Sequence, residues 1–449
     1  MTANLTDPRG SERFRFVRHT FVDGVAELVY AFDDGLELIE RVTFPGAPAV
    51  PPEREAAFAS ALRLLHIVAG VSYYKAGIPP SIVIEGEPLD EETATLADAL
   101  YLHGLAEFAY RNRLDLRGRI AFPFESRDRV AAPAIGLPAR SLLPIGGGKD
   151  SVVAVEAVKS IGGDATAAWV GNSPLIAECA ARTGLSTLNI SRELAPGLFE
   201  LNRLGAWNGH IPVTAINSAI LTLAALLYGY DSIVFANERS ASVATLEYEG
   251  QEVNHQWSKG FGFEKTFHDY LHSHVAADLD YCSLLRPWSE LAVTSAFARL
   301  GAAYFDAFSS CNRNFRILGP KPADRWCGQC PKCHFVFLAL APFMAKPRLV
   351  SIFGRNLLDD DSLADAFDAL LEYKNHKPFE CVGEGAEARA ALASLAERPE
   401  WREDALVSRF RREILPQLDS SELALEPWLK PGASHLVPSR LLGALDALG

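Results

Sequence analysis

Apolar and polar positions alternate in three short runs near the start of the chain, at residues 13–21, 25–32 and 36–44. A period of two residues is typical of β-strands, and the sequences VDG and DDG between the runs are turn signals. The pattern therefore predicts an antiparallel meander. Helical spacing of apolar positions follows at residues 53–69 and 91–112. Residues 1–135 are therefore expected to form an N-terminal α+β domain.

A stretch with the alanine, proline and glycine content of a linker follows at residues 127–141. Beyond it, short apolar runs at 142–145, 165–171, 186–190 and 232–237 alternate with helical patterns at 151–160, 174–183 and 213–227. This alternation indicates an α/β domain over residues 136–350, with a parallel sheet that binds its ligand at the carboxyl ends of the strands. Helical patterns at 361–374, 386–396 and 401–414 predict a helical C-terminal extension over residues 351–449.

Length and composition narrow the function. The chain has 449 residues, 49% hydrophobic and 22% charged, which indicates two or three globular domains. A net charge of −13 disfavours a general nucleic-acid binder, so no nucleic-acid partner is expected. The start lacks the apolar core of a signal peptide, and the apolar stretches at 219–228 and 335–344 are too short to cross a bilayer. We therefore expect a cytoplasmic protein with no membrane partner. The oligomeric state stays open.

The segment LPIGGGKDS, at residues 143–151, joins a predicted strand to a predicted helix. Glycines at such a turn let backbone N–H groups approach phosphate oxygens, and the helix N-terminus favours negative charge. A Walker loop is excluded, because Leu143 stands where its first glycine is needed and Asp150 where its hydroxyl is needed. The plain alternative is a glycine turn that ends a strand. The predicted phosphate-binding residues are Gly146, Gly147, Gly148, Lys149, Asp150 and Ser151.

The same segment resembles the SGGxDS loop of the N-type ATP-pyrophosphatase (PP-loop) superfamily. The match holds at Gly147, Gly148, Asp150 and Ser151, whereas Gly146 replaces the first serine. That family cleaves ATP between the α and β phosphates and converts a carboxylate or carbonyl oxygen into an adenylate. The resemblance implies that Asp150 lies near Mg²⁺ and the phosphates.

Four of the seven cysteines are grouped in a way that indicates a metal site. Three thiolates at CxxCxxC spacing can converge on one ion, and a fourth from upstream completes a closed tetrahedral zinc site. The predicted ligands are Cys311, Cys327, Cys330 and Cys333. The neighbouring His334 is expected to point elsewhere. Cys179, Cys282 and Cys381 have no partners in sequence and are expected in the core.

Polar residues after the fourth predicted strand suggest a substrate loop. Residues 210–242 resemble the 7-cyano-7-deazaguanine synthase branch of the PP-loop family, in which a proline-led helix leads into a strand that ends at such a loop, and which also carries a four-cysteine zinc site. Glu238 and Arg239 would lie in this loop. Residues 248–271 contain few apolar positions and are a candidate lid. In this segment His255, Lys259 and Glu264 are candidates for acid/base work or anion binding, although each could equally be a solvated side chain.

Over residues 13–415 the chain resembles the family of bacterial UDP-N-acetylmuramoyl-L-alanyl-L-glutamate epimerases. The resemblance rests on the meander and on five segments, which are GGGKDS, FANERSAS, EVNHQWSKGFGFEKTF, WCGQCPKC and YKNHKPFECVG. It implies ATP- and Mg²⁺-dependent inversion of the terminal L-glutamate of a peptidoglycan precursor. Adenylation suits this chemistry, because an α-proton beside an ionised carboxylate is very weakly acidic. Asp150, Glu238, Arg239, His255, Lys259 and Glu264 are the candidate catalytic residues, and the sequence does not rank them as acid or base.

Two alternatives stay open. One is a nitrile- or amide-forming adenylating ligase like the deazaguanine synthases, and the other is a non-catalytic nucleotide-binding module in which Gly146 marks a degenerate loop. Glutamine amidotransferases with an N-terminal cysteine nucleophile are excluded, because the chain begins MTAN. Enzymes that thiolate tRNA need a basic face, which the net charge disfavours.

Overall fold

The computed structural model describes residues 6–126, 130–316, 319–420 and 423–449, so the first three residues of the expected linker, 127–129, lie outside it. A nine-stranded sheet with the order β11-β8-β5-β6-β7-β3-β2-β1-β4 runs through the molecule. Its first five strands are parallel, as the alternating pattern predicted. They are β11 (Asp280–Ser283), β8 (Ser232–Phe235), β5 (Ser141–Pro144), β6 (Ala165–Val170) and β7 (Ser186–Glu193).

The predicted meander is confirmed as β1 (Arg13–Val22), β2 (Val25–Phe32) and β3 (Leu38–Thr43), with β4 (Ser81–Ile84) parallel to β1. The meander is not separate from the parallel strands, because β3 pairs antiparallel with β7. A buried ion pair at this seam joins Arg192 Nε to Glu40 Oε1 at 2.7 Å. The segments before and after residue 135 therefore share one sheet.

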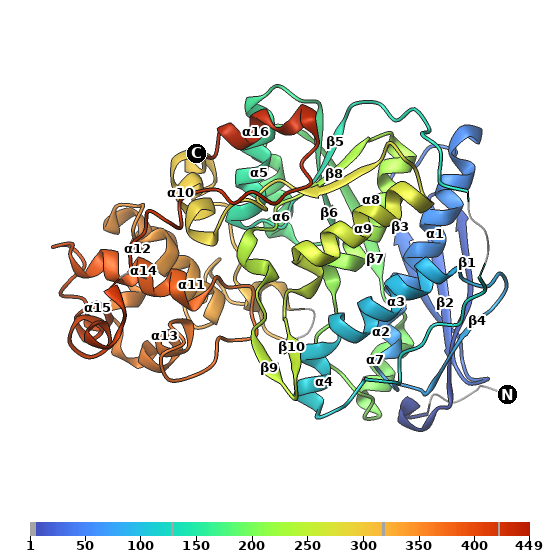
Figure 1. Cartoon of the computed structure of the whole chain (residues 1–449), viewed down its shortest axis with the longest axis horizontal. Coiled ribbons are helices and arrows are strands. Elements are labelled where there is room, and N and C mark those ends of the chain that lie inside the picture. Colours follow the sequence, from blue (N-terminus) through green and yellow to red (C-terminus); the bar gives the residue numbers. More distant parts are fainter. Residues whose placement is uncertain (1–5, 127–129, 317–318, 421–422) are drawn as a thin grey trace.

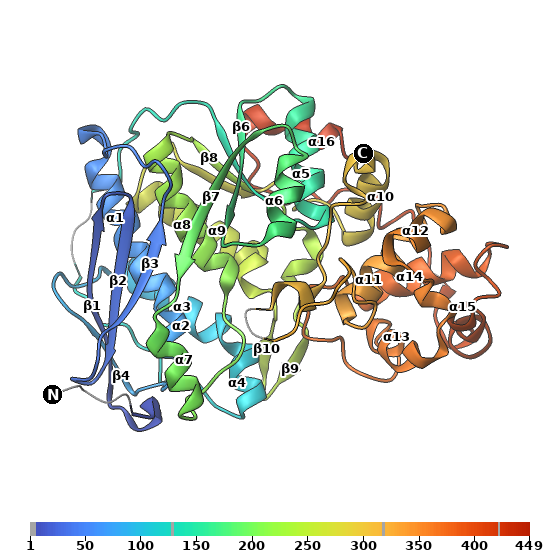
Figure 2. The same ribbon diagram turned by 180° about the vertical axis from the view of Figure 1, so that it is seen from behind.

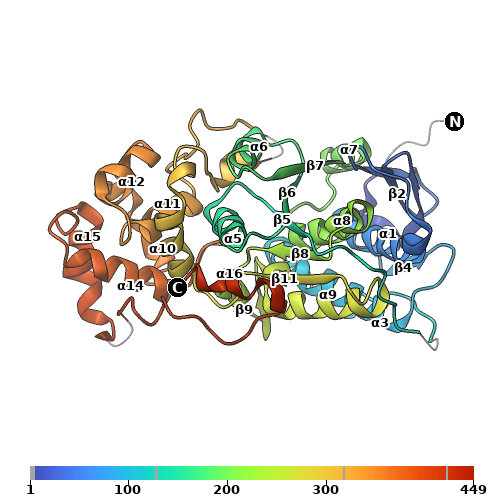
Figure 3. The ribbon, with the colours of Figure 1, turned by 90° about the horizontal axis from the view of Figure 1, so that it is seen from above.

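Helices cover both faces of the parallel strands, and Figure 3 shows α8 on one side and α5 on the other. The alternation of side chains explains this arrangement: Leu142 of β5 packs into one core and the next residue, Leu143, packs into the other. Helices that pack in the first core are α1 (Glu55–Ala69), α2 (Val71–Tyr74), α3 (Glu91–Gly104), α4 (Ala106–Asn112), α7 (Pro196–Arg203), α8 (Val213–Tyr228) and α9 (Phe261–His274). The second core contains α5 (Lys149–Ser160), α6 (Pro174–Ala181) and α10 (Glu290–Leu300).

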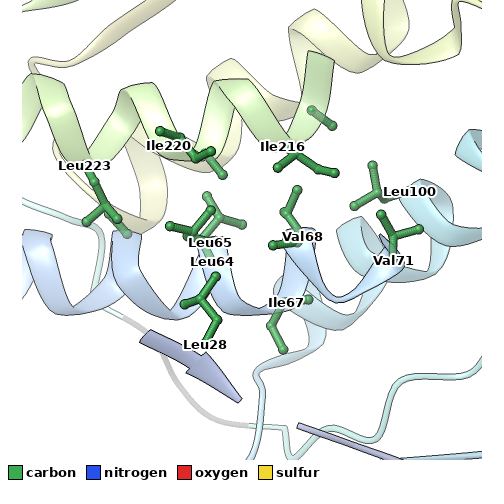
Figure 4. Packing of buried hydrophobic residues seen from close by; sticks show 14 of the residues in the cluster. Leu28, Leu64, Leu65, Ile67, Val68, Val71, Leu100, Ile216, Ile220 and Leu223 are labelled. Atoms are coloured by element: carbon green, nitrogen blue, oxygen red, sulfur yellow. The ribbon is translucent and has the colours of Figure 1, made fainter. Parts of the chain in front are cut away.

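The first core is centred on the contact between α1 and α8 (Figure 4). Leu65 of α1 faces Ile220 of α8, and Leu28 of β2 closes the layer from the sheet (Figure 4). The apolar run Pro52–Tyr74, which includes α1, is long and apolar enough to cross a membrane, but 78% of its most apolar window is buried in the molecule. The sequence predicted a helix over residues 53–69, but this run was not counted among the long apolar stretches. Its burial fits a core helix.

The structure corrects the expected lid. Residues 248–271 belong to a hairpin of β9 (Leu246–Tyr248) and β10 (Gln251–Val253), a short turn at Trp257–Lys259, and α9. Phe263, Phe267 and Leu271 of α9 are buried in the first core, so the segment is well packed. The sequence reading missed this because these three positions, spaced by four, were diluted by charged neighbours.

The C-terminal segment is a cluster of helices at the end of the molecule opposite the meander (Figures 1 and 2). It contains α11 (Pro331–Leu340), α12 (Lys346–Phe353), α13 (Ala364–Leu370), α14 (Gly385–Ala396) and α15 (Ala405–Arg409). The chain then returns to the sheet, where α16 (Gly443–Asp446) packs on α5 (Figure 1). Arg440 there pairs with Asp231. Within the predicted extension, residues 351–449, the structure has the helices α13, α14 and α15, but the helical cluster begins earlier, with α11 and α12, and the last part of the chain lies against the α/β unit.

Candidate active site

The glycine loop forms the turn between β5 and α5 that the sequence predicted. Gly147 has a left-handed backbone with φ +78°, and Gly148 is the N-cap of α5. The Gly146 N–H donates to Ser151 Oγ at 3.3 Å, which folds the loop back over the first turn of the helix. A Cβ built on Gly146 would meet nothing within 4 Å, so this position faces open space. The helix N-terminus with these amides is suited to anions.

A cavity of about 350 Å³ lies next to this loop, at the carboxyl ends of β5, β6 and β8. This edge is where parallel α/β sheets bind their ligands. Segments from across the chain form its wall, including Gly146, Asp150, Asn237, Lys259, Lys332 and Cys381. The glycine loop, the segment of the expected lid, the cysteine-rich segment and the C-terminal part therefore meet at one cavity.

Charged groups around Asp150 keep it ionised. Lys149, only 1% exposed, lies between Asp150 and Glu290 of α10 and pairs with both. Burial alone would lower the pKa of Lys149, but the two carboxylates raise it above its ordinary value. Burial would raise the pKa of Asp150, but the charges of Lys149, Lys332 and Lys259 hold it below its ordinary value. Since 29% of the Asp150 side chain remains exposed beside the cavity, its carboxylate could hold a divalent cation.

The two predicted residues of the loop after β8, Glu238 and Arg239, have side chains with different surroundings. Glu238 is buried, and its Oε2 accepts the Ala241 N–H at 2.9 Å. Burial, together with the nearby charges of Glu290 and Asp150, raises the pKa of Glu238 to about 7. The backbone N–H of Arg239 donates to Trp288 O at 2.8 Å, and its guanidinium lies beside Gly432 of the C-terminal tail, not among the residues of the cavity wall.

Lys259, His255 and Cys381 form a cluster at the cavity. Lys259 Nζ donates to Cys381 Sγ at 3.2 Å, and His255 Nδ1 lies 2.5 Å from Glu107 Oε2. Burial would raise the pKa of the Cys381 thiol, but Lys259, His255 and Lys332 together lower it to about 5. Burial would lower the pKa of His255, but Cys381 and Glu107 raise it to about 9.

The expectation that Cys381 is a core residue is therefore wrong, because this side chain lines the cavity. Cys179 and Cys282 are buried in the second core, as expected. Sequence reasoning missed Cys381 because Lys259 and His255 lie more than a hundred residues away and Lys332 lies 49 residues away. The available signal was its place in YKNHKPFECVG, a polar segment that carries part of the family resemblance.

Glu264 lies in a buried ion pair. Its Oε2 accepts from Arg286 Nε at 2.9 Å and Nη2 at 2.7 Å, and its Oε1 accepts the Ser283 N–H at 3.0 Å. Arg286 also donates to the backbone carbonyls of Glu238 and Lys259, at 2.7 and 2.5 Å. The pair therefore connects the two loops that approach the cavity, and Glu264 itself is not in the cavity wall.

The four predicted metal ligands converge. The sulfur atoms of Cys311, Cys327, Cys330 and Cys333 all lie within 4.8 Å of one another, and three of the Sγ–Sγ distances are 3.4, 3.7 and 4.0 Å. A tetrahedral zinc ion with Zn–S bonds of about 2.3 Å needs sulfur atoms about 3.8 Å apart, so the four thiols fit zinc. His334 points away, with Nε2 3.2 Å from Gly328 O.

The cysteine segment also touches the glycine loop, because the Ser309 N–H donates to Gly147 O at 2.8 Å. A larger cavity of about 660 Å³ lies elsewhere, lined by residues that include Arg18, His19 and Arg63. None of its lining residues comes from the glycine loop. The smaller cavity therefore holds the groups suited to phosphate and acid/base chemistry.

Comparison with known proteins gives a consistent match over most of the chain. Residues 5–284 match the MurL N-terminal domain family and residues 307–424 match the MurL C-terminal domain family. Three curated relatives carry the name UDP-N-acetyl-alpha-D-muramoyl-L-alanyl-L-glutamate epimerase. The protein of Xanthomonas oryzae pv. oryzae is 60% identical over 95% of each chain, that of Salinispora tropica 40% identical over 98% of this chain and 97% of its own, and that of a Micromonospora species 42% identical over 90% of each.

Proposed function

This chain belongs to the MurL family of UDP-N-acetylmuramoyl-L-alanyl-L-glutamate epimerases, and we propose that it inverts the terminal glutamate of this dipeptide through an acyl-adenylate. ATP would be cleaved to AMP and pyrophosphate in a Mg²⁺-dependent step. The reaction would serve peptidoglycan precursor biosynthesis in the cytoplasm. The UDP-linked dipeptide is the partner that this activity requires.

The observation that carries the proposal is the shared cavity: a glycine loop at a helix N-terminus and an ionised Asp150 lie in the same wall as Lys259 and Cys381. The loop resembles that of the N-type ATP-pyrophosphatases, as the sequence indicated. Activation of a carboxylate requires phosphate-binding groups, and removal of the proton beside it requires acid/base groups next to them. A cavity with phosphate-binding groups alone would support a non-catalytic nucleotide-binding module, and one with acid/base groups alone would not support adenylation.

The reaction follows from the charge of the substrate. Removal of an α-proton next to an ionised carboxylate would create a dianion, so the carboxylate must first lose its charge. In the proposed mechanism the amides of the glycine loop donate hydrogen bonds to phosphate oxygens. Lys149 pairs with Asp150 and keeps its carboxylate ionised next to these phosphates. Mg²⁺ held by Asp150 would neutralise the pyrophosphate that leaves. The carbonyl of the adenylate then accepts the electrons of the C–H bond, and reprotonation on the opposite face gives the D-epimer before water releases AMP.

The four cysteines are proposed to hold a structural Zn²⁺. Four thiolates leave no open position for water, so the ion would stabilise the fold and take no chemical part. The turn that it closes carries Lys332 to the cavity and, through Ser309, contacts the glycine loop.

Incubation with ATP, Mg²⁺ and the L-glutamate precursor in D₂O tests the proposal. The expected products are the D-epimer with deuterium at the α-carbon, AMP and pyrophosphate. Formation of ADP would overturn the adenylate mechanism. Turnover that depends on ammonia would instead support the amide- or nitrile-forming alternative, and binding of ATP without pyrophosphate release would support the non-catalytic one.

A further inference from the structure

Cys381 is the acceptor in a cluster of cationic side chains at the edge of the ligand cavity. Lys259 Nζ donates to its Sγ at 3.2 Å, and Lys259 and His255 both lower the pKa of the thiol. Lys332 of α11 donates to the backbone carbonyl of Cys381 and so holds its segment in place. Two other segments thus bring three cations to one cysteine that lines the cavity, and one of them, Lys259, donates directly to its sulfur.

We propose that the Cys381 thiolate is the base that removes the α-proton of the adenylated glutamate on one face of the α-carbon. The inference rests on the proposed function and adds to it the identity of one proton-transfer group. Cys381 would be a catalytic residue in the strict sense, since its sulfur would touch the reacting hydrogen.

The step balances without any further reagent. A bond forms between Sγ and the α-hydrogen, the C–H bond breaks, and its electron pair moves onto the carbonyl oxygen of the acyl-adenylate. Water on the opposite face then supplies a proton to the α-carbon, and the Cys381 thiol returns its proton to solvent through the cavity. The thiolate is regenerated and the configuration is inverted.

Glu238 does not line the cavity and accepts the Ala241 N–H, and the candidate groups near Cys381 are occupied. Lys259 lines the cavity, and Cys381 and nearby carboxylates raise its pKa although desolvation opposes this, so it stays protonated and has no lone pair to accept a proton. His255 pairs with Glu107, and its raised pKa of about 9 likewise leaves it protonated at neutral pH. Glu264 is sequestered in its ion pair with Arg286. Cys381 is therefore the group of this cluster that is anionic and lines the cavity.

The charged groups that face Cys381 decide its state. Lys259 and His255 come from the segment before α9, and Lys332 from α11. Two acidic residues oppose these cations. They are Glu380, whose pKa is raised by burial to about 7, and Glu107 of α4, which pairs with His255. The net effect is a thiol pKa of about 5, so Cys381 is a thiolate throughout the neutral range. A thiolate is the form that can act as a base.

The test separates adenylation from proton transfer in the full-length protein. Cys381→Ala should retain exchange of labelled pyrophosphate into ATP in the presence of substrate. It should also lose epimerisation and incorporation of α-deuterium from D₂O by at least about a hundredfold, as expected for loss of a general base. Cys179→Ala, which removes a buried thiol of the second core, is the matched control and should keep both activities.

Each outcome decides. Retention of deuterium incorporation in Cys381→Ala above about a hundredth of the wild-type rate would overturn the inference, and so would loss of pyrophosphate exchange in a variant that melts normally. If Cys381→Ala does not fold, Cys381→Ser provides the same comparison with a smaller change. A wild-type protein that exchanges neither pyrophosphate nor α-hydrogen would refute the proposed function itself, and the inference would fall with it.

The pH dependence of alkylation gives a second readout, because a cysteine with an ordinary pKa would not show the low midpoint expected for Cys381. The rate of Cys381 carboxamidomethylation by iodoacetamide, followed by peptide mass spectrometry, should rise with a midpoint near pH 5, and ATP with substrate should slow it. Lys259→Met removes the nearest cation, so the midpoint should move up by at least about one pH unit. A midpoint at the ordinary thiol value of about 8.5 in the wild type would contradict the anionic state.

Discussion

Replacement of Glu264 by glutamine tests whether this residue is a base or a structural anchor. Both Glu264 and Arg286 are 2% exposed, and their contact includes two hydrogen bonds of 2.7 and 2.9 Å. Loss of one partner from such a buried pair costs about 3–5 kcal/mol. Glutamine keeps one oxygen acceptor, so a cost near the lower end, about 3 kcal/mol, is expected. At roughly 2 °C per kcal/mol for a cooperative unit of this size, the melting midpoint should fall by about 6 °C.

Activity measured well below the melting midpoint should remain within about tenfold of wild type, because Glu264 lies outside the cavity wall. Loss of a general base would instead cost about 10²–10⁴-fold. The matched control is Glu27→Gln, which removes a solvent-exposed pair with Arg41 and should leave the melting midpoint unchanged. A normal melting midpoint together with a hundredfold loss of activity would refute the structural assignment and restore Glu264 as a catalytic candidate.

The reciprocal change, Arg286→Met, should make stability depend on pH. Burial already raises the pKa of Glu264, and Arg286 opposes that rise. Without the arginine the folded-state pKa rises further above the unfolded value, so the folded protein binds the proton more tightly. Stability is then present at low pH and is lost as the pH rises through the raised pKa. Calorimetry at pH 6 and pH 8.5 should show a larger loss for Arg286→Met at the higher pH.

The remaining predictions concern the glycine loop and the metal. Asp150→Ala should abolish pyrophosphate release while the melting midpoint changes little, and retained turnover would contradict the assignment of Asp150. Gly146→Ser restores the hydroxyl of the resembled loop at a position with open space, so it should fold normally and lower KM for ATP, whereas a raised KM would argue against phosphate at Gly146. Cys330→Ser should lower zinc content, measured by elemental analysis, toward zero and reduce soluble yield, and a wild type without stoichiometric zinc would refute the metal site.

Local patterns predicted the parts of the fold that depend on neighbouring residues. The period-two runs gave the three strands of the meander, and the glycine turn gave the start of α5 within two residues. The predicted helix at 91–112 is instead broken at Leu105 into α3 and α4, directly after Gly104, and the sequence reading did not use this glycine as a break. The pairing of β3 with β7 joins strands that lie about 150 residues apart, at the edge where the meander meets the parallel strands. No pattern of neighbouring residues predicts a contact over such a sequence distance.

The candidate site shows the same division. The glycine loop and the CxxCxxC turn were predictable, because each is a continuous segment whose spacing sets its geometry. Cys381 was not, since its environment is made by Lys259, His255 and Lys332, which lie far from it in sequence. Glu264 was taken for an acid/base group because its partner, Arg286, lies 22 residues further along the chain with no motif to link the two. A charged residue in a polar segment gives the same signal whether it faces a ligand or pairs inside the core.

The proposed zinc site would affect more than the stability of its own turn. Lys332 lies between the proposed ligands Cys330 and Cys333, and its ammonium group reaches both the carbonyl of Cys381 and, at 3.6 Å, Glu290. Glu290 in turn pairs with Lys149 of the glycine loop. Closure of the cysteine turn thus sets the position of one cation that contacts both the proposed adenylation site and the segment of the proposed base. An ion that takes no chemical part could therefore keep the adenylation site and the segment of the proposed base close together. The reaction needs this proximity, because the proton to be removed is on the carbon bonded to the carboxylate that is activated.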